Sequence, residues 1–192
     1  MIDIKFKNEI ICERIILRRP TLDFKTANML FSYIEKNREH LEKWLPWVPN
    51  NTTETDSFSF LQSVQKGFET NTKGEYFIIE KSTGDFCGII GIHVHNTPTK
   101  SEIALGYWQD KDKCGNGYIT EAVQRAETEI FSQNIMRIII ENDTENIASV
   151  NIPKKLGYHL DGVLRSSFYS TYFKNYRDKN VWSKLNPSCH HR

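Results

Sequence analysis

Apolar residues recur along the N-terminal third of the chain with two different periods. Residues 10–19 alternate between apolar and polar positions and predict a strand that ends at Pro20. A spacing of three to four residues then predicts a pair of short helices within residues 21–44. After a break that contains two prolines, the same spacing predicts a third helix over residues 53–73.

The middle of the chain predicts three strands that run back and forth. Residues 75–81 and 86–94 are separated by a Ser-Thr-Gly-Asp turn, which is typical of an antiparallel hairpin, and residues 103–108 form the third strand. A polar turn and a loop with two glycines follow, and a helical pattern begins near residue 118. Such a junction presents free backbone N–H groups and the positive end of a helix dipole, which favours a phosphate, although two glycines before a helix also fit an ordinary turn.

The C-terminal third predicts a buried strand, a short helix and a closing pair of strands. Residues 136–140 are nearly all apolar, which is typical of a strand covered on both faces, and their place after a strand and a helix predicts a parallel crossover. The short helix covers residues 149–156, and strands cover residues 158–164 and 172–184. The whole order predicts a three-layer α/β/α fold around a mixed, mostly antiparallel sheet of six to seven strands.

Composition and charge are those of an ordinary globular protein, with 39% hydrophobic residues, 26% charged residues and a net charge of +1 over 192 residues. This balance calls for neither nucleic acid nor a membrane as a partner. The first residues contain no apolar signal segment, and no window approaches the ~20 apolar residues of a membrane span, so we expect a cytoplasmic protein. The four cysteines form no CxxC pair, and His93 and His95 share a strand face without an evident third ligand, so no metal site is predicted.

Four motifs, taken in their order along the chain, resemble the GCN5-related N-acetyltransferase (GNAT) family. The motifs are LPW at residues 45–47, GYW with CGNGYITEA within residues 106–122, NIAS at residues 146–149 and KKLGYHLDGVLR at residues 154–165. Within the family, the pattern is most similar to the ribosomal-protein serine and alanine N-acetyltransferases. The resemblance implies one GNAT-type domain over residues 1–192, with residues 186–192 as a flexible tail, and acetyl-CoA as the cofactor that leaves as CoA.

The resemblance also implies two halves of an acetyl-CoA site. The pyrophosphate would lie on the backbone of the glycine loop, which comprises Lys113, Cys114, Gly115, Asn116, Gly117 and Tyr118. The pantetheine arm would pair with the strand at Leu105, Tyr107 and Trp108, where the sheet is expected to splay. Asp112 stands where the family usually has Gln or Arg, so we expect Asp112 to face solvent and Lys113 to supply positive charge.

The catalytic residues are less completely specified. Ser149 matches the family residue that protonates the leaving thiolate, and Asn146 matches a cofactor contact, although both residue types also cap helices. The glutamate base expected in the ribosomal-protein branch is absent from its place, and Glu102 is the substitute candidate, although it also fits an ordinary exposed carboxylate of a strand. Trp44 and Trp47 are candidates for the wall of the acceptor pocket, or they could simply pack the edge of the domain.

These residues predict transfer of an acetyl group to a primary amine, above all the N-terminal α-amino group of a protein or of an amino-acid-like small molecule. A polyamine or aminoglycoside acceptor is an alternative that calls for a strongly acidic cleft. A second alternative is an acetyl-CoA-binding sensor or scaffold without turnover, which the missing glutamate and Asp112 favour and Ser149 disfavours. A homodimer also stays open.

Overall fold

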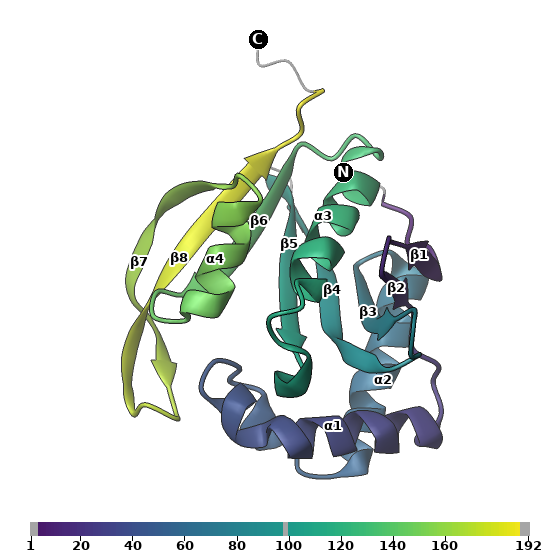
Figure 1. Ribbon diagram of the computed structural model, residues 1–192. Coiled ribbons are helices and arrows are strands. Elements are labelled where there is room, and N and C mark those ends of the chain that lie inside the picture. The colour runs from purple at the N-terminus through teal and green to yellow at the C-terminus, as the bar shows by residue number, and fades with distance from the viewer. Residues whose placement is uncertain (1–3, 98–99, 189–192) are drawn as a thin grey trace.

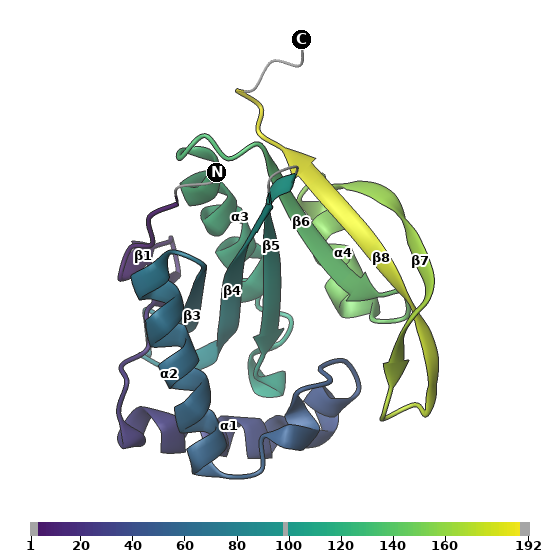
Figure 2. The ribbon, with the colours of Figure 1, turned by 180° about the vertical axis from the view of Figure 1, so that it is seen from behind.

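The computed structural model describes residues 4–97 and 100–188 of the chain. Within them, eight strands form one sheet in the order β1-β2-β3-β4-β5-β6-β8-β7, and every pair of neighbours is antiparallel except β5 and β6. Helices lie in front of this sheet in Figure 1, and another lies in front of it in Figure 2, where the sheet is seen from behind, so helices cover both faces. The expected α/β architecture is confirmed, but the sheet has eight strands rather than six to seven.

The additional strand arises at the N-terminus. The segment predicted as one strand over residues 10–19 is a hairpin of β1 (Glu9–Ile11) and β2 (Ile15–Arg18). Its turn is held by the backbone N–H of Cys12, which donates to the carbonyl oxygen of Ile15 over 3.1 Å. The prediction of a single strand was wrong because this turn contains neither Gly nor Pro to mark it in the sequence.

The predicted pair of helices is one helix, α1 (Phe24–Glu42), because no proline or glycine interrupts it. The Asp23 side chain caps it by accepting from the backbone N–H of Thr26. A short turn of 3-10 helix, η1 (Val48–Asn50), leads to α2 (Glu54–Thr70), where Thr53 and Asp56 form a reciprocal capping box.

Strands β3 (Lys73–Glu80), β4 (Phe86–Thr97) and β5 (Lys100–Gln109) form the expected antiparallel meander. After the short 3-10 turn η2 (Lys111–Lys113), helix α3 (Tyr118–Phe131) leads to β6 (Arg137–Asp143). Strand β6 pairs parallel with β5, so the predicted crossover is confirmed.

Helix α4 (Ile147–Lys155) precedes the closing hairpin of β7 (His159–Ser170) and β8 (Asn175–Leu185). Beyond β8, the side chain of Asn186 is buried and donates to the carbonyl oxygens of Phe131 and Ile135. Residues 189–192 of the predicted tail, which include Cys189, lie outside the described residues.

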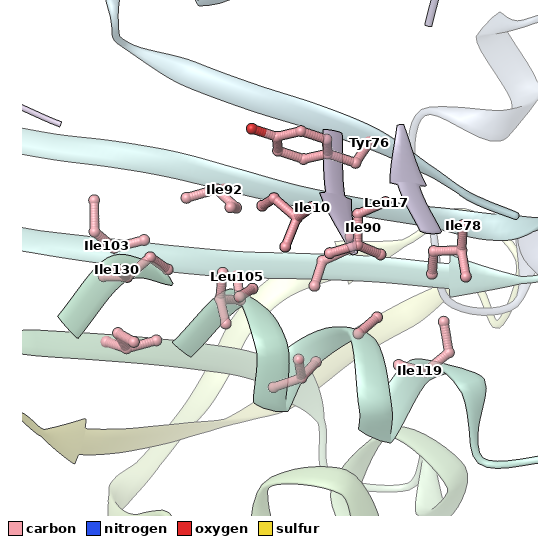
Figure 3. Packing of buried hydrophobic residues seen from close by; sticks show 14 of the residues in the cluster. Ile10, Leu17, Tyr76, Ile78, Ile90, Ile92, Ile103, Leu105, Ile119 and Ile130 are labelled. Atoms are coloured by element: carbon pink, nitrogen blue, oxygen red, sulfur yellow. The ribbon is translucent and has the colours of Figure 1, made fainter. Parts of the chain in front are cut away.

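Two groups of buried side chains hold the layers together. The larger packs the apolar face of α3 against the centre of the sheet, as Figure 3 shows for Ile119 and Ile130 beside Ile90 and Leu105. The smaller packs α1 and α2 against the ends of β3 and β4. Helix α2 lies over the β3 side of the sheet on the face opposite α3, and α1 runs across the end of the sheet (Figures 1 and 2).

The described cysteines, Cys12, Cys87 and Cys114, are free thiols. Among residues 4–97 and 100–188, no helix combines the length and the apolar character needed to cross a membrane.

Candidate active site

The sheet opens between its two parallel strands. Strands β5 and β6 pair only from Ile103 with Ile138 to Leu105 with Ile140. Beyond Leu105, β5 continues beside β4 and β6 continues beside β8, so the two halves of the sheet diverge as the sequence analysis expected. A cavity of about 580 Å³ lies at this divergence, lined by residues of β5, the end of β6, the start of α3 and α4.

The glycine loop at the end of this cavity presents a group of backbone donors. Gly115 and Gly117 adopt left-handed backbone angles, with φ of 84° and 77°, and helix α3 starts directly after Gly117. Within the described part of the chain, the backbone N–H groups of residues 115–120 have no protein acceptor. These N–H groups and the positive end of the α3 dipole therefore form a site suited to an anion.

The sequence analysis placed the pyrophosphate on the backbone from Lys113 onward, but the unpaired N–H groups begin two residues later, at Gly115. The backbone N–H of Lys113 donates to the carbonyl oxygen of Asp110, and that of Cys114 donates to the carbonyl oxygen of Lys111. Both N–H groups are therefore already used, although the Cys114 residue still lines the cavity. The side chain of Tyr118 points to Glu80, to which its hydroxyl donates over 2.7 Å.

The charges around the loop differ in part from the expectation. Asp112 does face solvent, and it pairs with Lys36 over 2.8 Å. Lys113, in contrast, pairs with Asp85 and Glu80 over 2.7 and 2.8 Å, and these two carboxylates raise the pKa of its ammonium group above the usual range. Its charge is neutralised by the β3–β4 turn, so Lys113 anchors the loop rather than offering a free cation.

Arg14 is a second cation beside the loop, and the sequence analysis did not single it out. Its guanidinium donates to the carbonyl oxygen of Asn116 over 2.9 Å and pairs with Glu121 over 2.8 Å. It also lies 3.5 Å from the position that a Cβ atom on Gly117 would take. Only the tertiary structure brings Arg14 here, because about a hundred residues separate it from the loop.

Two hydroxyl groups meet between β5 and α4. Asn146 caps α4 by accepting from the backbone N–H of Ser149 over 3.2 Å, and the Ser149 hydroxyl lies 3.4 Å from the hydroxyl of Tyr107. Burial raises the pKa of Tyr107 to about 12, so its phenol stays protonated at neutral pH. The Tyr107 hydroxyl donates to the carbonyl oxygen of Ser149 over 3.3 Å and accepts from the Ser149 hydroxyl, so the two form a short chain of hydroxyl groups at the cavity lining, along which a proton could pass. The sequence analysis gave Tyr107 no such part.

A second cavity of about 520 Å³ lies on the other side of β5, between that strand and helices α1 and α2. Gly106, Tyr107 and Trp108 belong to the linings of both cavities. Of the two tryptophans predicted to form an acceptor wall, Trp47 lines this second cavity. Trp44 lines the first cavity instead, and its ring packs against Phe173 of the β7–β8 hairpin.

Two buried glutamates of the central strands have different surroundings. Glu102 is buried in the paired part of β5, 3.4 Å from Arg137 and 3.7 Å from His95, and it belongs to the lining of neither cavity. Glu75 lines the second cavity, and burial raises the pKa of its carboxyl to about 7. His93 lies 3.3 Å from Glu75, and burial lowers the pKa of its ring to about 4.

The comparisons with known proteins agree with this geometry. Residues 14–159 match the family model described as "Acetyltransferase (GNAT) domain". The ribosomal-protein-serine acetyltransferase of Escherichia coli (strain K12) is 25% identical over 160 residues, which cover 81% of this chain and 85% of that protein.

Two solved structures share the fold. The ribosomal L7/L12 α-N-protein acetyltransferase RimL, in complex with coenzyme A, superimposes with a TM-score of 0.84 at 20% identity, over 94% of this chain and 99% of that one. The microcin C7 self-immunity acetyltransferase MccE, in complex with acetyl-CoA and AMP, superimposes with a TM-score of 0.81 at 23% identity, over 90% of this chain and 93% of that one. Since the family model covers most of the chain, the protein belongs to the GNAT family of acetyltransferases, whose acetyl donor is acetyl-CoA.

Proposed function

We propose that this protein transfers the acetyl group of acetyl-CoA to the N-terminal α-amino group of a protein, with a ribosomal protein as the first candidate. The observation that carries the proposal is the pair of cavities that meet at Gly106, Tyr107 and Trp108 of β5. A thioester held in the first cavity and an amine held in the second would meet at this strand. The matching ribosomal-protein-serine acetyltransferase acts on an acceptor of the same class.

The first cavity has the groups that acetyl-CoA requires. The unpaired N–H groups of residues 115–120 suit its pyrophosphate, and the edge of β5 beyond Leu105 suits the peptide-like pantetheine arm. The acetyl carbonyl would then be polarised by backbone N–H groups of β5. Ser149 and Tyr107 would supply the proton that the departing thiolate requires.

The second cavity fits an α-amino group better than a polyamine. Its lining contains the carboxylates of Asp56 and Glu75 among aromatic and aliphatic side chains that include Trp47 and Phe60. Asp56 is already engaged as the cap of α2, where it accepts from Thr52 and Thr53. Such a lining lacks the strongly acidic character that a chain of several ammonium groups calls for.

The function can be tested in two steps. Calorimetry first measures acetyl-CoA binding, and CoA thiol release is then followed with N-terminal Ser and Ala peptides, a polyamine and an aminoacyl nucleotide as acceptors. We expect release with the peptides. If acetyl-CoA binds but no acceptor leads to thiol release, the protein is a sensor or scaffold. Thiol release with the polyamine or the nucleotide alone would assign a small-molecule acceptor. If acetyl-CoA does not bind, the proposed cofactor site is wrong.

Replacement of Ser149 by alanine should lower kcat about tenfold, because one of two hydroxyls that can protonate the thiolate is lost. The dissociation constant of acetyl-CoA should change by less than about twofold, since Asn146 caps α4 through the backbone N–H of Ser149 and not through its side chain. Steady-state kinetics and calorimetry on Ser149→Ala, Tyr107→Phe and the double variant measure both quantities. An unchanged kcat in the double variant would leave Ser149 as a structural residue of α4.

Two further expectations remain proposals. The chain is proposed to form one catalytic domain over residues 1–192 in the cytoplasm, and its oligomeric state stays open between a monomer and a homodimer. Light scattering on the purified chain measures the molecular mass in solution, for which 22.5 kDa is the value of one copy.

A further inference from the structure

A row of three residues crosses the sheet beneath the second cavity. Glu75 of β3 is the register partner of Gly91 on β4, and Gly91 is the register partner of Gly106 on β5. A Cβ atom on Gly91 would lie 2.5 Å from Glu75 Oε2 and 2.6 Å from His93 Nε2. The absence of a side chain at Gly91 is therefore what allows the Glu75 carboxylate and the His93 ring to lie over β4.

This row connects the carboxylate with the strand that both cavities share. Gly106 lines the first and the second cavity, and a Cβ atom on it would lie 3.9 Å from His93 Nε2. Gly106 thus leaves space between His93 and the place at which a thioester in the first cavity would be attacked. An amine held in the second cavity would therefore share that space with the Glu75 carboxylate and with β5.

Among the described residues, the groups around Glu75 do not place a strong positive charge on its carboxylate. His93 is neutral at pH 7 because burial lowers its pKa to about 4, so it faces the carboxylate as a dipole and not as a charge. Lys73, on the same strand, lowers the pKa of Glu75 only as the lesser effect beside burial. Asp56 on α2 faces the same cavity but is held by its capping bonds, and His95 on β4 lies beside Glu102.

We infer that Glu75 is the proton acceptor for the incoming ammonium group, positioned by the glycine at residue 91. The inference rests on the proposed function. One proton moves from the ammonium nitrogen to the Glu75 carboxylate, the freed lone pair forms the C–N bond, and the C–S bond breaks. After the C–N bond has formed, the nitrogen carries one proton more than the amide product. That proton passes through the Ser149 and Tyr107 hydroxyls to the departing sulfur, and Glu75 returns its own proton to solvent.

The carboxylate of Glu75 is suited to this step by its pKa of about 7. At neutral pH a substantial fraction is ionised and can accept a proton, while its basicity is far greater than that of an exposed glutamate. Activity should therefore rise with pH through about 7, as the carboxyl group loses its proton.

The first experiment compares kcat/KM against pH for the full chain and three glutamine variants, with an N-terminal Ser or Ala peptide as the acceptor. Glu75→Gln should lose about 100-fold at pH 7, and its remaining activity should follow the deprotonation of the α-amino group near pH ~8. Glu129→Gln is the matched control, because Glu129 is a buried carboxylate on α3 that pairs with Lys7 and Arg125 and lines neither cavity. Glu102→Gln tests the competing candidate.

A loss below about tenfold in Glu75→Gln, or the same pH profile as the unchanged chain, overturns the inference but leaves the proposed function intact. The rise of kcat/KM near pH 7 could instead disappear in Glu102→Gln and persist in Glu75→Gln. That result would assign the base to Glu102 and would also overturn the inference. If the unchanged chain binds acetyl-CoA but releases no thiol with any amine, the proposed function is wrong. The role of Glu75 as proton acceptor is then wrong as well.

A second variant leaves the carboxylate in place but moves it. Gly91→Ala should push the side chains of Glu75 and His93 away from β4 and reduce kcat at least about tenfold, with acetyl-CoA binding unchanged by calorimetry. The matched control is Gly162→Ala in β7, where a Cβ atom meets nothing within 4 Å. An active Gly91→Ala variant with the original pH profile would show that the position of Glu75 is irrelevant to turnover.

One readout does not depend on activity. Burial raises the pKa of Glu75 in the folded chain above its ordinary value of 4.5 to about 7, so the folded chain holds a proton there that the unfolded chain has released. Its contribution to stability is therefore present at low pH and is lost as the pH rises through about 7. The free energy of unfolding in urea should fall between pH 5 and pH 8 for the unchanged chain relative to Glu75→Gln. The same pH dependence in both proteins would overturn the special environment assigned to Glu75.

Discussion

Replacement of Gly117 by valine is expected to abolish detectable acetyl-CoA binding. Gly117 has a φ of 77°, which a β-branched residue does not adopt without strain, so the loop must change its path. That change turns the unpaired N–H groups of residues 115–120 away from the pyrophosphate. Loss of two such bonds to a charged group weakens binding by about 3 kcal/mol or more, which is at least about 100-fold in the dissociation constant measured by calorimetry.

The variant Gly84→Val is the control that separates the backbone strain caused by Gly117→Val from its effect on the cofactor site. Gly84 lies in the β3–β4 turn with a φ of 76°, and a Cβ atom on it meets nothing within 4 Å. Both variants place valine in the same left-handed conformation, so they should lose similar stability, but only Gly117→Val should lose the cofactor. Unchanged affinity in Gly117→Val would show that acetyl-CoA binds elsewhere.

Replacement of Arg177 by methionine should destabilise the protein by about 3 kcal/mol, since it removes one partner of a buried ion pair and leaves the Asp143 carboxylate without its countercharge. The Arg177 guanidinium forms two bonds to Asp143, of 2.8 and 2.9 Å, with both side chains buried between β6 and β8. It also lies over the ring of Phe173 at 4.5 Å. The measurement is the midpoint and slope of urea unfolding at pH 7.

This pair is also connected to the site. The Asp143 carboxylate accepts from the backbone N–H of Glu145, and its carbonyl oxygen accepts from that of Asn146, so the turn that starts α4 depends on it. Arg177→Met should therefore loosen the position of Ser149 as well as lower the stability.

A neighbouring pair on the same two strands is the control. Lys179 pairs with Glu141 over 3.0 Å, but both side chains are partly exposed, so Lys179→Met should cost less than about 1 kcal/mol. Replacing both Asp143 and Arg177 by apolar residues should restore part of the loss. Equal effects of Arg177→Met and Lys179→Met would mean that burial of the Asp143–Arg177 pair has no energetic consequence.

The sequence by itself determined the features that local spacing records. The glycine loop and the capping residues before α4 each lie within a few positions of one another, so the strand-loop-helix junction and the presence of α4 could be predicted. The predicted start of α4 at residue 149 is two residues later than its observed start at Ile147. The crossover between β5 and β6 follows in the same way from the apolar character of the buried strand. Motif order identified the family for the same reason, because the order of motifs is itself a property of the chain.

Only the tertiary structure decided which distant residues meet at the site. Register brings Glu75, Gly91 and Gly106 into one row. A shift of one residue in the β3–β4 pairing would put Glu75 on the face of the sheet opposite His93, and a shift in the β4–β5 pairing would remove Gly106 from the row. The sequence analysis assigned the N–H groups of Lys113 and Cys114 to the pyrophosphate site. The spacing of residues in the sequence does not show that these groups already donate to carbonyl oxygens of the preceding turn. Arg14 beside the loop, and Trp44 and Trp47 in different cavities, depend equally on packing between elements far apart in sequence, which no local period encodes.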